Sequence, residues 1–159
     1  AEQFSIELLG FVLAISYMAS LLSAPIFGIM SDRIKRTSAL AITLLIGAVG
    51  YGSTFFLQDP FSVATIACLI LIGMAEVGCI ITSGVLIAEQ APDRLRGSIV
   101  GLFTLCGAVG ILVASIVGGY LFDHWMKTGP FVFFGAISAL VLVWTLALQF
   151  RHPDTAPST

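Results

Sequence analysis

The sequence predicts an all-α protein, a polytopic membrane bundle of five transmembrane helices. Hydrophobic residues make up 58% of its 159 residues, and charged residues make up only 10%. A soluble domain of this length has too much surface to hide that much apolar side chain. A membrane span needs about 20 predominantly apolar residues. Five such runs follow one another, at about residues 4–30, 38–57, 61–88, 98–122 and 131–150.

Short polar segments separate these five runs. The charged segment from Asp32 to Arg36 ends the first run, and the turn Gln58-Asp59-Pro60 ends the second. Pro130 precedes the fifth run and suits a first helical turn, where the missing N–H is not needed. No strand-like alternation and no coiled-coil heptad competes with the helical interpretation.

The distribution of basic residues predicts the orientation in the membrane. Cytoplasmic loops carry an excess of Lys and Arg. Six of the seven bases lie on one side if the five runs alternate, and only Lys127 lies on the other. The N-terminal end is therefore expected outside and the C-terminus in the cytoplasm. The six bases on the inner side are Arg33, Lys35, Arg36, Arg94, Arg96 and Arg151.

Several classes of function find no support in the sequence. The net charge is −2 and no basic patch exists apart from the loops, so no nucleic-acid partner is expected. Cys68, Cys79 and Cys106 lie inside apolar runs without metal-ligand spacing, which is typical of free thiols packed in helices. The apolar runs hold no paired carboxylates, no histidine-metal set and no nucleophile with a base. We therefore expect no metal, no cofactor, no catalytic residue and no enzyme.

Glu76 is the one ionisable side chain deep in an apolar run. Placing a carboxylate there costs about 2.5–3.5 kcal/mol on insertion scales, so such a residue normally faces water or a partner. Cys79 and Ser83 follow at helical spacing on the expected face of the same helix. These three residues are the candidates for proton coupling or substrate binding. The alternative is a protonated Glu76 that hydrogen-bonds a neighbouring helix and only holds the bundle together.

The charged segment after the first run resembles the loop motif of the major facilitator superfamily, Gly-x-x-x-Asp-Arg-x-Gly-Arg-Arg/Lys. Lys35 replaces the second glycine of the motif and Thr37 replaces its last base. A glycine one turn before the aspartate would let two helices approach closely. The residues that match the motif are Gly28, Asp32, Arg33 and Arg36.

Two further stretches are similar to motifs of the same family. Glu89 to Gly97 resembles the loop between the fourth and fifth helices of a half, and Arg96 there could reach Glu89 or Asp32. With the first loop it implies a cytoplasmic gate. Gly101, Gly110, Gly118 and Gly119 match the antiporter glycine motif, although Ala114 and Ser115 replace its Gly-Pro pair. Gly110, Ala114 and Gly118 form a stripe of small residues that we expect to pack against another helix. We expect the same of the small residues Ser16, Ser20 and Ser23 in the first run.

The resemblance implies a half-transporter of six helices, of which this chain supplies helices two to six. The start at Ala1 suggests a cut inside a longer protein, so the first helix and the other half are expected partners. Met74 stands where the first half usually carries an arginine, which favours the C-terminal half. The expected location is the cell inner or plasma membrane.

The expected function is secondary active transport of a small solute by alternating access, coupled to protons. A non-transporting receptor or scaffold on the same fold is the alternative, and an intramembrane enzyme is a weaker one. The sequence leaves open which solute is carried, and whether it moves by import or export and by symport, antiport or uniport.

Overall fold

The structure, a computed structural model, describes residues 2–57, 62–126 and 128–151. Each of the five apolar runs forms a helix, and all five helices are long and apolar enough to cross a membrane. The described residues contain no strand, which confirms the all-α class. The helices are α1 (Glu2–Arg33), α2 (Arg36–Ser53), α3 (Val63–Gln90), α4 (Arg96–His124) and α5 (Gly129–Arg151), and the short 3₁₀ turn η1 (Thr54–Phe56) follows α2.

The helices extend beyond most of the predicted bounds. α1 continues to Arg33, α3 to Gln90, and α4 already begins at Arg96. An apolar run marks the part of a helix that fits the hydrocarbon, whereas backbone hydrogen bonds continue into the hydrated interface where charged side chains are tolerated. α2 is shorter than expected because its last turn tightens into η1. The predicted turn at residues 58–60, Lys127 and residues 152–159 lie outside the described part.

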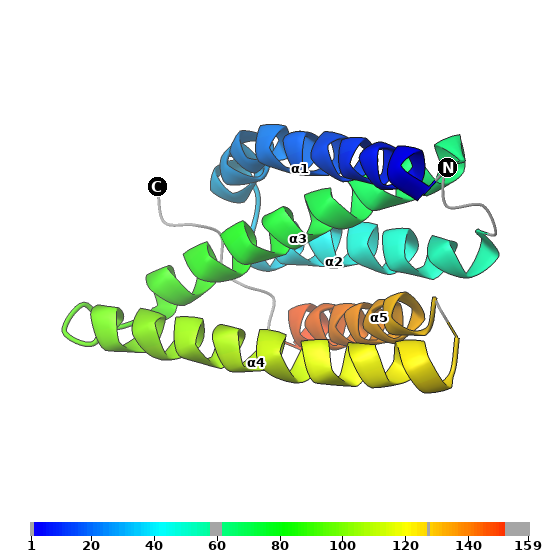
Figure 1. Cartoon of the computed structure of the whole chain (residues 1–159). Helices are drawn as coiled ribbons and strands as arrows, with labels where there is room; N and C mark the ends of the chain where they lie inside the picture. The colour runs from blue at the N-terminus through cyan, green and yellow to red at the C-terminus, as the bar shows by residue number, and fades with distance from the viewer. Residues whose placement is uncertain (1, 58–61, 127, 152–159) are drawn as a thin grey trace.

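The packed part of the bundle is built around α3 (Figure 1). α3 packs against α1 and α2, and α2 in turn packs against α5. α4 lies beside α5 and has few contacts with the other helices. None of the most apolar stretch of α4 is buried within the described chain, compared with 39% of that of α2. α4 therefore presents an open apolar surface.

Small side chains allow the close contact of α1 with α3. Ser16, Ser20 and Ser23 are buried, and each hydroxyl donates to a carbonyl of its own helix. Ser20 lies so close to Gly73 of α3 that a Cβ on this glycine would overlap its hydroxyl. Ser20 therefore packs against α3 as predicted, and Ser16 and Ser23 are buried on the same helix.

Gly78→Ala is expected to loosen the contact of α3 with its two neighbours. A Cβ at Gly78 would lie 2.6 Å from Thr43 Cγ2 of α2 and 3.1 Å from the Phe27 ring of α1. Overpacking of this kind typically costs about 1–3 kcal/mol, and thermal unfolding in detergent or lipid would measure it. Gly84→Ala on the same helix is the control, because nothing lies within 4 Å of its Cβ position. Equal unfolding of both variants would contradict the packing described here.

Candidate functional site

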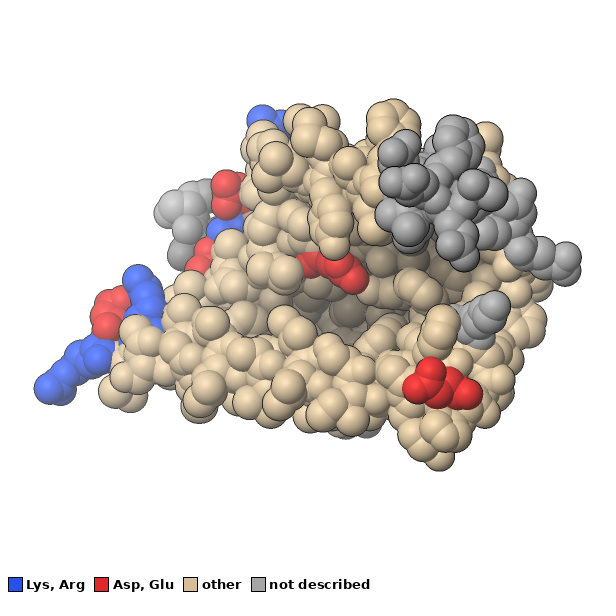
Figure 2. All heavy atoms as spheres, viewed as in Figure 1, with Lys and Arg blue, Asp and Glu red and all other residues tan. Residues whose placement is uncertain are grey.

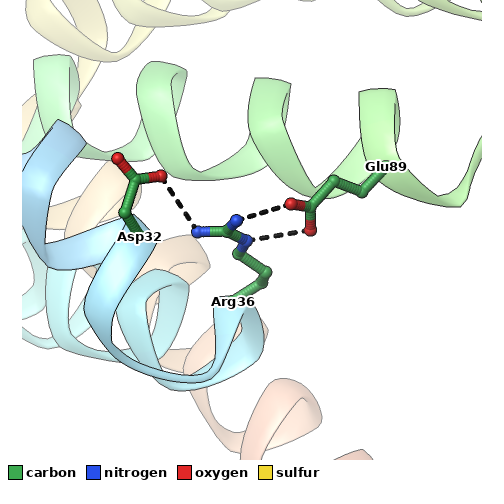
Figure 3. Close-up of polar contacts among 3 residues, drawn as sticks. All are labelled: Asp32, Arg36 and Glu89. Atoms are coloured by element: carbon green, nitrogen blue, oxygen red, sulfur yellow. Dashed lines mark hydrogen bonds and ion pairs between the residues drawn. The ribbon is translucent and has the colours of Figure 1, made fainter. Parts of the chain in front are cut away.

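Three charged side chains from three helices meet at one end of the bundle. Arg36 at the start of α2 binds Glu89 near the end of α3 through two bonds, Nε to Oε2 at 2.8 Å and Nη2 to Oε1 at 2.5 Å. The same guanidinium donates from Nη1 to Asp32 Oδ1 of α1 at 3.3 Å (Figure 3). We call Asp32, Arg36 and Glu89 the Arg36 cluster. It ties the ends of α1, α2 and α3 together.

The Arg36 cluster exists because the chain turns sharply at this point. Only Ile34 and Lys35 separate α1 from α2. The short turn therefore keeps the side chains of Asp32 and Arg36 close together at adjoining helix ends. The planar guanidinium suits bidentate binding of a carboxylate. The Arg36 side chain is 25% exposed and that of Glu89 is 48% exposed. Partly exposed ion pairs contribute about 0.2–1 kcal/mol, so the cluster is a weak and breakable contact.

The structure corrects two expectations about this end of the bundle. Arg96 binds Asp93, three residues earlier on the same segment, at 2.9 Å, and not Glu89 or Asp32. Glu89 instead accepts two hydrogen bonds from Arg36, which lies on a different helix. No atom lies within 4 Å of a Cβ built at Gly28, so this glycine is not a point of close helix approach in the described chain. Arg33 is exposed at the end of α1.

Glu76 lies in the middle of α3 and opens on a groove between helices. The groove has a volume of about 370 Å³, and we call it the Glu76 groove. Figure 2 shows acidic atoms at the edge of a hollow in an otherwise uncharged part of this face, with the other charged atoms near the ends of the molecule. The walls of the Glu76 groove come from α2, α3, α4 and α5. The residues that line it are Tyr51, Glu76, Ile111, Ala114, Ser115, Gly118, Gly119 and Phe134.

Tyr51 is the functional candidate that the sequence interpretation missed. Its hydroxyl donates a hydrogen bond of 2.6 Å to Glu76 Oε1. Glu76 therefore has a partner on a neighbouring helix, as the packing alternative requires, and it also borders an open groove, as a proton-binding role requires. The sequence spacing is consistent with this contact once Arg36 is known to pair with Glu89. Tyr51 lies 15 residues after Arg36, and Glu76 lies 13 residues before Glu89, so on antiparallel helices the two residues reach a similar level.

Cys79 and Ser83 do not join Glu76 at the groove. Cys79 Sγ donates to Thr43 Oγ1 of α2 at 3.4 Å, and Ser83 Oγ donates to the Cys79 carbonyl at 2.5 Å. Neither residue is among those that line the Glu76 groove. Residues spaced three and four apart spread over a broad arc of a helix, so they need not all face one groove. Here α2 covers the part of the arc that holds Cys79.

The small residues of α4 divide into two groups. Gly118 packs against α5, with Pro130 Cβ 3.7 Å and Phe134 Cε2 3.9 Å from its Cβ position, and Ala114 lines the Glu76 groove. Gly101, Gly110 and Gly119 have no atom within 4 Å of a Cβ position, so the described chain offers them no partner helix. A second apolar groove of about 660 Å³ runs between α4 and α5 beside Gly110. Among the described residues, no three His, Cys, Asp or Glu side chains are placed to hold a metal ion.

These features define an integral, multi-pass helical membrane protein, and among the described residues Glu76 is the carboxylate in the middle of a span. The chain matches the profile of the Major Facilitator Superfamily over residues 1–159. The protein belongs to this superfamily, as the loop motif around Asp32 and Arg36 indicates.

Proteins similar to this chain occur in several bacteria. The magnetosome protein MamH of Paramagnetospirillum magneticum is 28% identical over 143 residues, which cover 90% of this chain and 33% of MamH. The magnetosome protein MamZ of Magnetospirillum gryphiswaldense is 31% identical over 82% of this chain and 20% of MamZ. The multidrug resistance protein MdtG of Salmonella dublin is 30% identical over 93% of this chain and 35% of MdtG. No solved structure matches the chain. The chain spans about a third or less of the length of these relatives.

Proposed function

We propose that this chain is part of a secondary active transporter, in which a small solute crosses the membrane by alternating access and protons supply the driving force. The observation that supports this most is the position of Glu76. It is the one acidic or basic side chain in the middle of a described helix, and it borders a groove between helices. Ionisable residues at such depth typically mark ion or substrate pathways.

Glu76 is the proposed proton carrier. The carboxyl lies 13 residues before Glu89 on the same helix, which places it roughly 20 Å along α3 from the Arg36 cluster at 1.5 Å per residue. Apolar surroundings disfavour a charged carboxylate, whereas water in an open groove favours it. A cavity that opens first to one side and then to the other would therefore let Glu76 load and release one proton in each cycle.

The Arg36 cluster, with Arg33, Gly28 and Arg96 nearby, is the proposed cytoplasmic gate. Weak, solvent-accessible ion pairs between helix ends can break and re-form as helices move. Lys and Arg gather at this end, and the rule for positive loops places it inside, with the C-terminus cytoplasmic. The membrane proposed is the cell inner or plasma membrane.

The rest of the transporter is the proposed partner of this chain. The described helices form the Glu76 groove, which is open on one side, and the relatives are about three times longer than the matched region. The other half and the first helix of this half would complete the cavity. MdtG carries multidrug resistance in its name, so drugs are among the first solutes to test.

Solute flux in proteoliposomes tests this proposal. The full-length protein would be reconstituted, an inward or outward pH gradient applied, and a panel of drugs, amines, organic acids and sugars followed by mass spectrometry. We expect at least one solute to accumulate against its gradient only while the pH gradient lasts. Binding without flux across the whole panel would favour a receptor or scaffold, and chemical conversion of a solute would favour an enzyme.

A further inference from the structure

Tyr51 is the described side chain that binds the Glu76 carboxylate. Its hydroxyl donates to Oε1 at 2.6 Å, and both residues line the Glu76 groove. Within the described ranges no second hydrogen bond to this carboxylate is present. A glutamate has three rotatable side-chain bonds, so the single bond from Tyr51 decides which way the carboxyl points.

α5 holds the Tyr51 ring in place. The ring centroid lies 6.5 Å from that of Phe131 and 6.3 Å from that of Phe134. The backbones of α2 and α5 also meet at this level, because a Cβ at Gly135 would lie 3.0 Å from Tyr51 Cβ and 3.3 Å from the Gly52 nitrogen. The tyrosine is thus fixed from behind by α5 and presents its hydroxyl to α3.

We propose that Tyr51 is the positioning residue for Glu76. Its hydroxyl holds Oε1 against the wall formed by α2 and leaves Oε2 for protons or solute in the groove. The inference rests on the proposed function of Glu76, and it adds that α2 and α5 set the orientation of this carboxyl. A functional group held by a supporting hydrogen bond on rigid helices keeps its productive geometry, whereas an unsupported one samples several rotamers.

Infrared difference spectroscopy on the full-length protein in lipid tests this inference without a solute. The spectrum of the parent minus that of Glu76→Gln isolates the Glu76 carboxyl bands at a chosen pH. The same subtraction in a Tyr51→Phe background gives the Glu76 carboxyl bands in the absence of the Tyr51 hydroxyl. We expect these bands to shift, because a carboxyl that accepts a hydrogen bond vibrates at a different frequency from a free one. Phenylalanine keeps the ring that contacts Phe131 and Phe134.

Tyr17→Phe is the matched control, because it removes a hydroxyl from an exposed tyrosine on α1. It should leave the Glu76 bands unchanged. Gly135→Ala is a second variant that displaces Tyr51 through the backbone, and it should move the same bands. Unchanged bands in Tyr51→Phe, or an equal shift in Tyr17→Phe, would overturn the positioning role. Bands that shift with Tyr51→Phe but never change with pH would support that role while refuting the proton-carrying function of Glu76.

Discussion

Glu76→Gln is expected to abolish accumulation driven by a pH gradient while solute exchange at equal pH continues. Glutamine keeps the shape of the side chain, and its amide oxygen can still accept the bond from Tyr51, but it cannot take up or release a proton. Net movement and exchange of a radiolabelled solute in proteoliposomes would separate the two effects.

Asp123→Asn is the matched control for this prediction. Asp123 is an exposed acid near the end of α4, and it is not among the residues that line the Glu76 groove. It should retain accumulation at the parent level. Undiminished, pH-dependent accumulation by Glu76→Gln would show that another group carries the proton, and loss of exchange as well would place Glu76 in solute binding.

The second large effect is expected at the Arg36 cluster. Arg36→Gln and Glu89→Gln should each lower the transport rate, and the double variant should be little worse than either single change. Residues in one ion-pair network show coupling energies of about 0.5–3 kcal/mol, and the two direct bonds between these side chains predict such coupling. A double-mutant cycle on transport rates, normalised to the amount of protein in the membrane, measures it.

Arg94→Gln is the control for the charge change, because Arg94 is an exposed base on the loop between α3 and α4. It should leave the rate unchanged. Asp32→Asn should have a smaller effect than Arg36→Gln, because Asp32 is 75% exposed and its bond to Arg36 is the longest of the cluster. Additive effects of Arg36→Gln and Glu89→Gln would contradict a shared gate, and failure of the variants to accumulate in the membrane would indicate a folding role.

Composition and hydrophobic runs were enough to predict the five helices. A span in hydrocarbon must satisfy its backbone internally, which leaves few choices for long apolar segments. The ends were less predictable because charged residues such as Arg33 and Arg96 continue a helix into water. Glu76 stood out for a similar reason, since an acid in an apolar run is costly and rare.

The pairings between helices were not readable from the sequence. The loop motifs indicated Arg96 as a partner for Glu89 or Asp32, whereas the pairing of Arg36 with Glu89 depends on how α2 and α3 lie against each other. Nothing in the sequence singled out Tyr51, because only the register of α2 against α3 places its hydroxyl on Glu76. The small residues of α4 could be recognised as a stripe, but of the glycines of α4 only Gly118 contacts another helix within the described chain.

Proton movement during transport is the most direct test of Glu76 as the proton carrier. The full-length protein would be reconstituted with a pH-sensitive dye inside the vesicles, and a solute identified in the flux panel would be added without a pH gradient. We expect a change of internal pH that accompanies solute entry or exit, persists in Asp123→Asn and disappears in Glu76→Gln. Solute flux without any proton movement, or proton movement that survives in Glu76→Gln, would contradict it.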